Sequence, residues 1–440
     1  QAHAGIRAVE RARGLGDVYK RQYLLHRNHK VTIFEANDYI GGHTNTVEVN
    51  HAGRTHQVDT GFIVSNERNY DNFFKLMSRL DVSLQPTEMS FSVRNDKLNL
   101  EYNGHNLNTL FSQRSNFFRP KFYQLVLDIL KFNKAAKAFI ENNHSEPLKL
   151  SDFIAIHKLS DTFKNNYLLP MVAAIWSCSL QQAEEFPIEF FVKFFHHHGL
   201  LDIKNRPQWY VIKGGSKTYV KPLISPFEDR IKLNCPVDQV SRKESSIEIH
   251  HAGGTDEFDQ VIFACHSDQA LNLIEEPAAV EKDILIGLSY QENDVILHCD
   301  DTLMPDRKLA WASWNFLAGE RSANQPPLVT YCMNILQSIE SEIPLLVSLN
   351  ARHKIDPEKI LRELKYSHPI YSYQAIQSQS RRSEICGVDR FHYCGAYWYS
   401  GFHEDGVRSA LDVAARFGDC LLYTSPSPRD LSTSRMPSSA

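Results

Sequence analysis

The chain lacks the signatures of several protein classes. Its eight cysteines include no Cys-x-x-Cys pair, which indicates free thiols in a reducing compartment and no zinc site. No apolar run reaches the roughly 18 residues of a membrane-spanning helix, and the N-terminus has no signal-peptide core. A net charge of −4 argues against a general nucleic-acid binder. These absences predict a cytoplasmic protein that does not bind nucleic acid.

Two common catalytic arrangements are also missing. The sequence contains neither a convincing Ser-His-Asp set nor a pair of carboxylates spaced for acid–base catalysis. His196, His197 and His198 are adjacent, but helical neighbours share a face only three or four positions apart, so the three cannot all bind one ion. We therefore predict no metal site and interpret these histidines as packing at a domain interface.

The remaining composition is that of a globular protein. Apolar residues make up 42% and charged residues 23% of the chain, both ordinary values. A length of 440 residues is enough for two or three domains with large cores.

An apolar segment near the start ends in an acid. Residues 30–36 read Lys-Val-Thr-Ile-Phe-Glu-Ala, and residues 41–44 read Gly-Gly-His-Thr. A dinucleotide-binding fold holds an adenosine ribose in this way, because the carboxylate at the strand end accepts hydrogen bonds from the hydroxyl groups. The glycines beyond it allow close approach of the backbone to a cofactor. We therefore predict that Glu35 binds a ribose; a surface acid at a strand end is the alternative.

A second glycine-rich region lies near the other end of the chain. Residues 391–396 read Phe-His-Tyr-Cys-Gly-Ala, and residues 401–406 read Gly-Phe-His-Glu-Asp-Gly. One extended cofactor, held at both ends by a discontinuous domain, explains the two regions together. FAD fits this arrangement better than NAD.

With these motifs, residues 23–418 resemble the superfamily of FAD-dependent amine oxidases, phytoene desaturases and protoporphyrinogen oxidases. They are most similar to the bacterial proteins described as predicted NAD/FAD-binding oxidoreductases. The matching stretches are residues 35–36 with 41–44, 58–64, 175–177, 213–216 and 401–406.

The resemblance implies an α/β fold with two parts. The first is a discontinuous, Rossmann-like FAD-binding domain of residues 23–75, 205–275 and 385–420. The second is an inserted α+β substrate domain of residues 76–204 and 276–384.

The resemblance also implies which residues contact FAD. These are Glu35, Ala36, Gly41, Gly42, His43, Thr44, Thr60, Gly61, Val237, Gly395, Ala396, Gly406 and Val407. Tyr397, Trp398 and His403 are our candidates for groups near the flavin ring, with core packing of the aromatic residues as the alternative.

One part of the family pattern is missing. The superfamily opens with an apolar strand and Gly-x-Gly-x-x-Gly, whose amides hold the pyrophosphate. Here Gly14 and Gly16 are followed by Tyr19 at the third position, and residues 6–13 are rich in charge. We interpret residues 1–22 and 421–440 as non-native segments, with ordinary disordered tails as the alternative, and expect the natural loop upstream.

Hydrophobic periodicity predicts the main elements. Helices are expected over residues 69–80, 110–142, 356–364 and 407–417, and another begins near Ser151 as N-cap. Strands are expected over residues 231–240, 246–250, 261–264, 295–299, 310–315 and 328–334.

Two functions from different classes fit these observations. The first is an FAD-dependent oxidoreductase that transfers hydride between the flavin and an apolar, lipid-like substrate, such as an unsaturated or methylene-modified fatty acyl chain. The second is a flavin-free lipid-binding or scaffold protein that retains the fold. Basic and aromatic side chains interleave over residues 110–142 and predict peripheral contact with the inner membrane face; a solvated helix with an apolar core stripe is the alternative.

Overall fold

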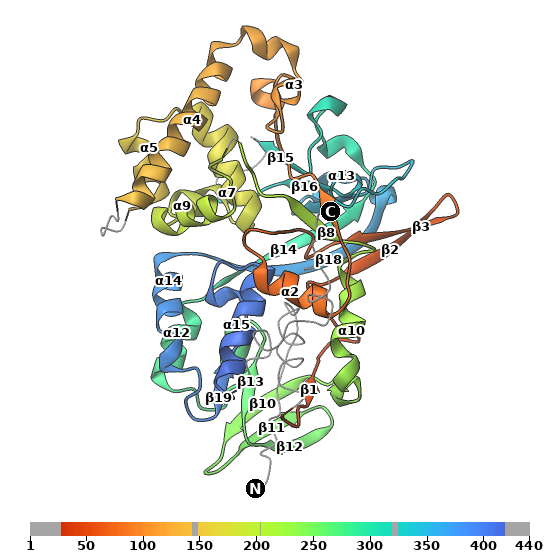
Figure 1. Ribbon diagram of the computed structural model, residues 1–440, viewed down its shortest axis with the longest axis vertical. Coiled ribbons are helices and arrows are strands. Elements are labelled where there is room, and N and C mark those ends of the chain that lie inside the picture. Colours follow the sequence, from red (N-terminus) through yellow and green to blue (C-terminus); the bar gives the residue numbers. More distant parts are fainter. Residues whose placement is uncertain (1–27, 143–147, 203, 319–323, 419–440) are drawn as a thin grey trace, which may run out of the picture.

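The computed structural model describes residues 28–142, 148–202, 204–318 and 324–418 (Figure 1). The segments interpreted as non-native, residues 1–22 and 421–440, lie outside this part of the chain.

Strands from three distant parts of the sequence lie in the lower half of Figure 1. β1 (Ile33–Phe34) pairs in parallel with β9 (Ile231–Lys232), and β13 (Val261–Phe263) pairs in parallel with β19 (Phe391–Tyr393). Parallel strands of this kind are buried on both faces, and every residue of β1, β13 and β19 is buried.

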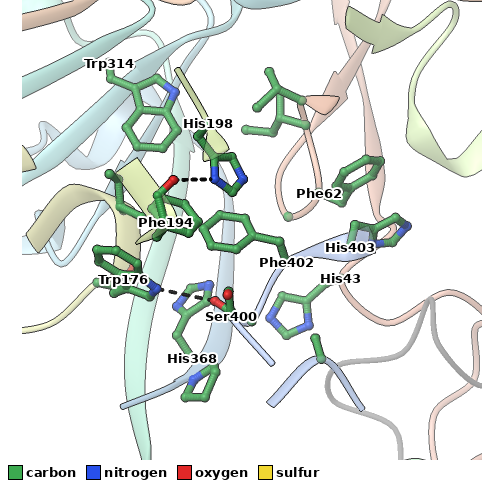
Figure 2. Close-up of a pocket in the computed structure, with 18 of the residues that line it drawn as sticks. His43, Phe62, Trp176, Phe194, His198, Trp314, His368, Ser400, Phe402 and His403 are labelled. Carbon is green, nitrogen blue, oxygen red and sulfur yellow. Dashed lines mark hydrogen bonds between the residues drawn. The ribbon is translucent and has the colours of Figure 1, made fainter. Parts of the chain in front are cut away.

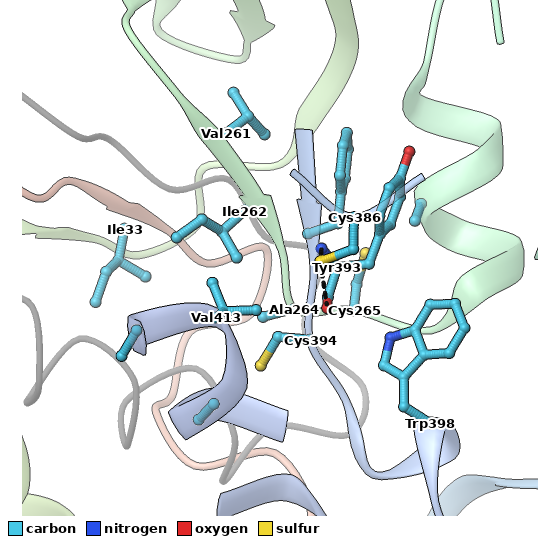
Figure 3. Packing of buried hydrophobic residues seen from close by; sticks show 14 of the residues in the cluster. Ile33, Val261, Ile262, Ala264, Cys265, Cys386, Tyr393, Cys394, Trp398 and Val413 are labelled. Carbon is cyan, nitrogen blue, oxygen red and sulfur yellow. Dashed lines mark hydrogen bonds between the residues drawn. The ribbon is translucent and has the colours of Figure 1, made fainter. Parts of the chain in front are cut away.

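Figure 3 shows how these strands are covered. Helix α15 (His403–Ala415) places Val413 beside Ile262 of β13 and Cys394, which follows β19. An antiparallel three-stranded sheet completes this half of the molecule, made of β10 (Val237–Arg242), β11 (Ile247–His251) and β12 (Gly254–Phe258).

A seven-stranded sheet forms the centre of the molecule. Its order is β18-β14-β17-β16-β15-β6-β7, and all neighbours are antiparallel except β15 and β6. Its strands are β6 (Phe91–Asn95), β7 (Leu100–Asn103), β14 (Tyr290–His298), β15 (Trp314–Ala318), β16 (Val329–Cys332), β17 (Leu346–Leu349) and β18 (Ile360–Pro369).

A helical layer lies above this sheet in Figure 1. Its long member α4 (Pro120–Glu141) buries Phe122, Leu125, Phe132 and Phe139 on one side, the spacing expected of an amphipathic helix. The other helices of the layer are α3 (Leu107–Leu110), α5 (Leu150–Ile156), α6 (Asp161–Phe163), α7 (Leu169–Trp176), α8 (Leu180–Glu184) and α9 (Ile188–His197).

Shorter strands and helices make up the rest of the described structure. The strands are β2 (Thr46–His51), β3 (Arg54–Asp59), β4 (Ser65–Asn66), β5 (Leu84–Thr87) and β8 (Trp209–Ile212). The helices are α2 (Asp71–Arg79), α10 (Val220–Ile224), α11 (Ser267–Leu273), α12 (Ala279–Ile286), α13 (Met333–Leu336) and α14 (Tyr373–Ser380).

Several predicted elements are confirmed, and one is wrong. Helices α2, α4 and α15 lie within or overlap the three helices expected over 69–80, 110–142 and 407–417. Residues 356–364, however, form a single 3-10 turn, Pro357–Lys359, and then enter β18. Pairing with β14 along the whole of β18 satisfies the backbone there and overrides the local helix preference.

Three predicted boundaries also move. Helix α5 begins at Leu150, so Ser151 lies inside the helix and is not its N-cap. The strand expected over 231–240 is split into β9 and β10, because Asn234 between them has a left-handed backbone with φ of 50°. The strand expected from residue 310 begins only at Trp314, after a 3-10 turn at Lys308–Ala310.

Candidate active site

A cavity of about 360 Å³ lies between the central sheet, the helical layer and the turn before α15 (Figure 2). Its wall is mostly aromatic and aliphatic; Figure 2 labels Phe62, Trp176, Phe194, Trp314 and Phe402 among the residues that form it. Among the described residues, no Asp or Glu lines this cavity, and Arg206 is the one Lys or Arg that does. The cavity therefore favours an apolar ligand.

Glu35 lies where a ribose ligand is expected, at the end of β1. The backbone holds its position, since Glu35 N donates to Lys232 O at 2.9 Å and Cys235 N donates to Glu35 O at 2.9 Å. The carboxylate is fully buried, and its Oε1 accepts hydrogen bonds from Asn37 N (2.9 Å) and Asn37 Nδ2 (3.0 Å). Ala36 follows Glu35 directly, and Val237, fully buried, begins β10 beside this strand end.

Two of the predicted glycines are required by the backbone itself. Gly41 has φ of +125°, and a Cβ there would lie 2.7 Å from Thr44 O. A Cβ on Gly61 would lie 2.2 Å from His43 O, because Phe62 N donates to that carbonyl at 2.7 Å. These contacts fold residues 41–44 against residues 60–62, and they bring His43, Thr60 and Gly61 to the cavity wall. Gly42 also has a positive φ, 55°.

Tyr219 joins the two glycine-rich regions. Its hydroxyl lies 2.6 Å from Thr44 Oγ1 and 2.6 Å from His403 Nε2. The His403 ring also stacks on Phe62, with centroids 3.7 Å apart and planes 10° apart. Sequence motifs from opposite ends of the chain therefore meet through one buried tyrosine that sequence reasoning missed.

Asp59 is a second residue that sequence reasoning missed, although it lies inside the matching stretch at residues 58–64. Its Oδ1 accepts hydrogen bonds from Thr46 Oγ1 (2.6 Å), Ser216 N (2.8 Å) and Ser216 Oγ (2.9 Å). Its Oδ2 accepts from Gln337 Nε2 at 3.1 Å, and its own N–H donates to Gln337 Oε1 at 2.8 Å. Burial raises the pKa of Asp59 to about 6, against these hydrogen bonds, which lower it. One carboxylate thus ties the stretch at 58–64 to the Gly-Gly-Ser segment at 214–216 and to Gln337 at the end of α13.

Two neutral histidines face each other at the cavity wall. The ring centroid of His43 lies 4.5 Å from that of Tyr366 and 5.7 Å from that of His368. Burial lowers the pKa of His43, and the neighbouring His368 and His266 lower it further. Burial also lowers the pKa of His368 to about 4. At neutral pH both rings are uncharged, so in each ring one nitrogen can donate a hydrogen bond and the other can accept one.

Polar atoms at the wall fit a cofactor with hydrogen-bonding edges. The Nε2 atom of His43 and the hydroxyl of Tyr397 are buried without a hydrogen-bond partner in the described part of the chain. Buried polar groups are normally satisfied, so a ligand with complementary acceptors and donors fits here. The ring system of FAD carries such groups on one edge, while its faces suit the apolar wall.

The C-terminal candidates divide into two groups. Gly395, Ala396, Tyr397 and His403 line the cavity, whereas Trp398 does not. The Trp398 indole is buried in the core (Figure 3), where the Arg382 guanidinium lies 5.3 Å from its ring centroid.

The two remaining C-terminal candidates, Gly406 and Val407, are buried in the first turns of α15. Gly395 N donates to Ser409 Oγ of the same helix at 2.7 Å, which ties the glycine turn to α15. Gly406 and Val407 themselves do not line the cavity.

The histidine triplet does not form a metal site. The described residues contain no cluster of three or more His, Cys, Asp or Glu side chains that could hold an ion. His198 lines the cavity, its ring stacked on Phe194 with centroids 3.8 Å apart and its Nδ1 3.0 Å from Phe194 O (Figure 2).

The fold is shared with several solved enzyme structures. A fatty acid isomerase from P. acnes, which produces CLA, matches with a TM-score of 0.65 and 14% identity over 94% of this chain and 98% of its own. Cyclohexylamine oxidase from Brevibacterium oxydans has a TM-score of 0.64 and 12% identity over 94% and 98%. Putrescine oxidase bound to putrescine has a TM-score of 0.64 and 12% identity over 94% and 99%. At these identities the likeness establishes the predicted α/β FAD-binding fold.

The sequence comparison identifies the family. No curated protein sequence matches the chain. The family model for flavin-containing amine oxidoreductases, however, matches residues 22–334, which is more than half of the chain. The protein therefore belongs to the flavin-containing amine oxidoreductase family, and it is an FAD-dependent oxidoreductase rather than a flavin-free scaffold.

Proposed function

We propose that this flavoenzyme transfers hydride between FAD and a long apolar substrate that carries an anionic end, such as a fatty acid. The cavity wall supports this proposal because it is aromatic and aliphatic and, among the described residues, contains no carboxylate. The one permanent charge on the part of the wall that the structure describes is the guanidinium of Arg206.

An amine substrate fits this wall less well. A primary amine is positively charged at neutral pH and is usually bound by a carboxylate or by aromatic faces. Aromatic rings are present here, but the Arg206 guanidinium in the wall is positive and repels a cation. Solved structures with this fold differ in substrate. One is named a fatty acid isomerase, and another was solved with the diamine putrescine bound.

In this proposal Arg206 binds the anionic end of the substrate where the cavity meets solvent. Its side chain is exposed, and its Nε donates to Asp202 O at 2.9 Å, which holds the Nε end of the guanidinium in place. Tyr167, also in the cavity wall, is close enough for Arg206 to lower its pKa, although burial raises that pKa to about 12 overall. Arg206 can therefore pair with a carboxylate while the chain of the substrate lies in the apolar interior.

The cofactor would lie along the two glycine-rich regions. Glu35 would bind the adenosine ribose, Val237 would contact the adenine, and residues 41–44 would approach the middle of the cofactor. Thr60, Gly61, Gly395, Ala396, Gly406 and Val407 would surround the flavin end. When bound, FAD supplies a ring that accepts or donates a hydride.

The chain's own residues have positioning roles in this proposal. Phe62, Phe194, Phe402 and Trp176 exclude water from the cavity interior, and neutral His43 and the Tyr397 hydroxyl offer hydrogen bonds at its wall. Among the described residues, no Asp, Glu or Lys lines the cavity, in keeping with chemistry carried by the cofactor.

Ligands of equal length test the substrate class. Oleate and oleylamine are titrated into the purified protein, and each dissociation constant is measured. We expect oleate to bind at least tenfold more tightly, and we expect Arg206→Ala to lose about tenfold in oleate affinity, roughly 1.4 kcal/mol. Lys204→Ala removes an exposed cation two residues away that does not line the cavity, and it should leave the affinity unchanged.

Turnover gives a second readout. With FAD bound, the flavin absorbance should change on anaerobic addition of oleate-type substrates and not on addition of oleylamine. Tighter binding of oleylamine, or flavin reduction by oleylamine alone, would overturn the proposed substrate class.

A further inference from the structure

Residues 107–130, in and before helix α4, expose an unusual number of large apolar side chains. Fourteen large hydrophobic residues are exposed in the described part of the chain, and six of them lie between residues 107 and 130. Phe118 is 89% exposed, Leu107 77% and Leu127 59%. We define the α4 face as these six residues, Leu107, Phe117, Phe118, Tyr123, Leu127 and Leu130, with the nearby lysines Lys121, Lys131 and Lys134.

The helix geometry brings four of these residues to one side of α4. Tyr123, Leu127, Leu130 and Lys134 are spaced by four, three and four positions, which places them along one stripe of α4. The opposite stripe is the buried one described above and packs toward the helical layer. Helix α4 is therefore apolar on both sides, which neither the core nor ordinary solvation explains.

Aromatic contacts hold the N-terminal end of the face in place. The Phe117 ring stacks on Phe111 with centroids 4.1 Å and planes 5° apart, and the Tyr123 hydroxyl donates to Phe117 O at 3.1 Å. Arg119 Nη1 donates to Asn116 Oδ1 at 3.3 Å and is bonded to Asn99 O. Phe118 is thus presented on an ordered turn.

The charges around the face are almost all positive. Residues 107–134 contain five Arg or Lys residues and one acid, Asp128. Asp128 is buried and accepts hydrogen bonds from Gln124 Nε2 (3.0 Å) and Ser160 N (3.1 Å), so it does not neutralise the surface. Lys121, Lys131 and Lys134 form no ion pair within the described residues.

From this arrangement we infer that the α4 face binds peripherally to an anionic lipid membrane. Large apolar side chains insert at the boundary of headgroups and acyl chains, while flanking lysines contact anionic headgroups. None of the described helices is long and apolar enough to cross a bilayer, so the contact is one of surface insertion. A second copy of the chain suits the face less, because two such faces would bring their lysines together.

The inference does not depend on the proposed substrate, since it rests on exposure and charge outside the cavity. It is tested with the full chain by flotation with vesicles of phosphatidylglycerol and phosphatidylcholine, and with vesicles of phosphatidylcholine alone. We expect binding to the anionic vesicles, at least tenfold weaker binding to the neutral ones, and loss of binding as salt rises.

Two variants separate charge from insertion. Lys131→Glu/Lys134→Glu should lower the partition coefficient on anionic vesicles at least tenfold, because each surface cation contributes about fivefold. Phe118→Ser/Leu127→Ser should lower it about as much, since both side chains are already exposed and their loss leaves the fold intact.

A matched control lies on helix α12, in the lower half of Figure 1. Ile286 is 62% exposed there and Lys282 precedes it by four positions, so Lys282→Glu/Ile286→Ser makes the same kinds of change elsewhere. This variant should bind vesicles like the parent, and circular dichroism should be unchanged in all variants.

Three results would overturn the inference. The first is a parent protein that does not float with anionic vesicles. The second is equal partitioning of the parent and both α4 variants. The third is sedimentation of the parent as a dimer that Phe118→Ser/Leu127→Ser dissociates, which would assign the face to a second copy of the chain.

Discussion

The Tyr219 hydroxyl and the Nε2 atom of His403 lie 2.6 Å apart. Because the same hydroxyl contacts Thr44, this pair couples the turn after β1 to the start of α15. Both regions are proposed to hold FAD, so their relative position decides whether one extended cofactor can contact both.

Removing this hydroxyl should weaken both the fold and cofactor binding. Tyr219→Phe keeps the buried ring but removes the hydrogen bonds to Thr44 and His403, which should lower the free energy of unfolding by about 1–3 kcal/mol. Denaturant unfolding measures the change. Tyr123→Phe, which removes a hydrogen bond at the surface, serves as control and should cost less than about 0.5 kcal/mol. A Tyr219→Phe protein as stable as the parent would contradict the structural role of the pair.

The ribose role of Glu35 predicts a specific loss of FAD affinity. Glu35→Ala should weaken FAD binding by roughly 1.5–3 kcal/mol, the scale of a charge-assisted hydrogen bond. Glu35→Gln keeps the size and one acceptor, so its loss should be smaller. Asp38→Ala, a change of an exposed acid in the same loop, should bind FAD like the parent in the same titration. Equal FAD affinity in Glu35→Ala and the parent would remove Glu35 from the site.

The pairing of Asp59 with Gln337 predicts a rescue by exchange. Asp59→Asn turns an acceptor facing Gln337 Nε2 into a donor, and two facing donors should cost about 1–3 kcal/mol of stability. In Asp59→Asn/Gln337→Glu, the carboxylate introduced at position 337 accepts from both the side-chain amide and the backbone N–H at position 59, so much of the loss should return. A double-mutant cycle above pH 7 measures this coupling. Additive losses in the double variant would show that the pair does not interact as described.

Buried histidines predict acid sensitivity. Burial lowers the pKa of His198, His298 and His368 to about 4 each, below the unfolded value of about 6.5. The unfolded chain therefore binds these protons first, and the stability that the neutral rings provide is present above about pH 6.5 and is lost as the pH falls toward 4.

Two carboxyl groups act in the opposite direction. Burial raises the pKa of Asp59 to about 6 and that of Asp405 to about 7. The stability that their protonated forms contribute therefore falls as the pH rises from about 4 through these two values.

His298 isolates the histidine effect, because it lies away from the cavity and contacts Ser348 Oγ at 2.8 Å. His298→Gln should reduce the acid-side slope of stability by up to about 1.4 kcal/mol per pH unit. Parallel stability–pH curves for His298→Gln and the parent would refute the assignment.

The sequence by itself determined the local elements and the cofactor class. The apolar strand that ends at Glu35, the glycines that follow it and the amphipathic pattern of α4 are short-range features, set by side-chain size and by periodicity along a few turns. They were sufficient to indicate a discontinuous FAD-binding protein, and the predicted family and fold are confirmed. The exact domain boundaries and the roles of the individual site residues stay predictions.

Only the tertiary structure decided what the cavity is lined with and which residues join its parts. Tyr219, Gln337, His368 and Arg206 gave no signal in the sequence, because each acts on a partner far away along the chain. Residues 360–369 became a strand for the same reason, since the ladder with β14 outweighs a local helix preference. Local propensities amount to a few tenths of a kcal/mol per residue, whereas burial and long-range hydrogen bonds contribute more at each site, so the distant contacts prevail wherever the two disagree.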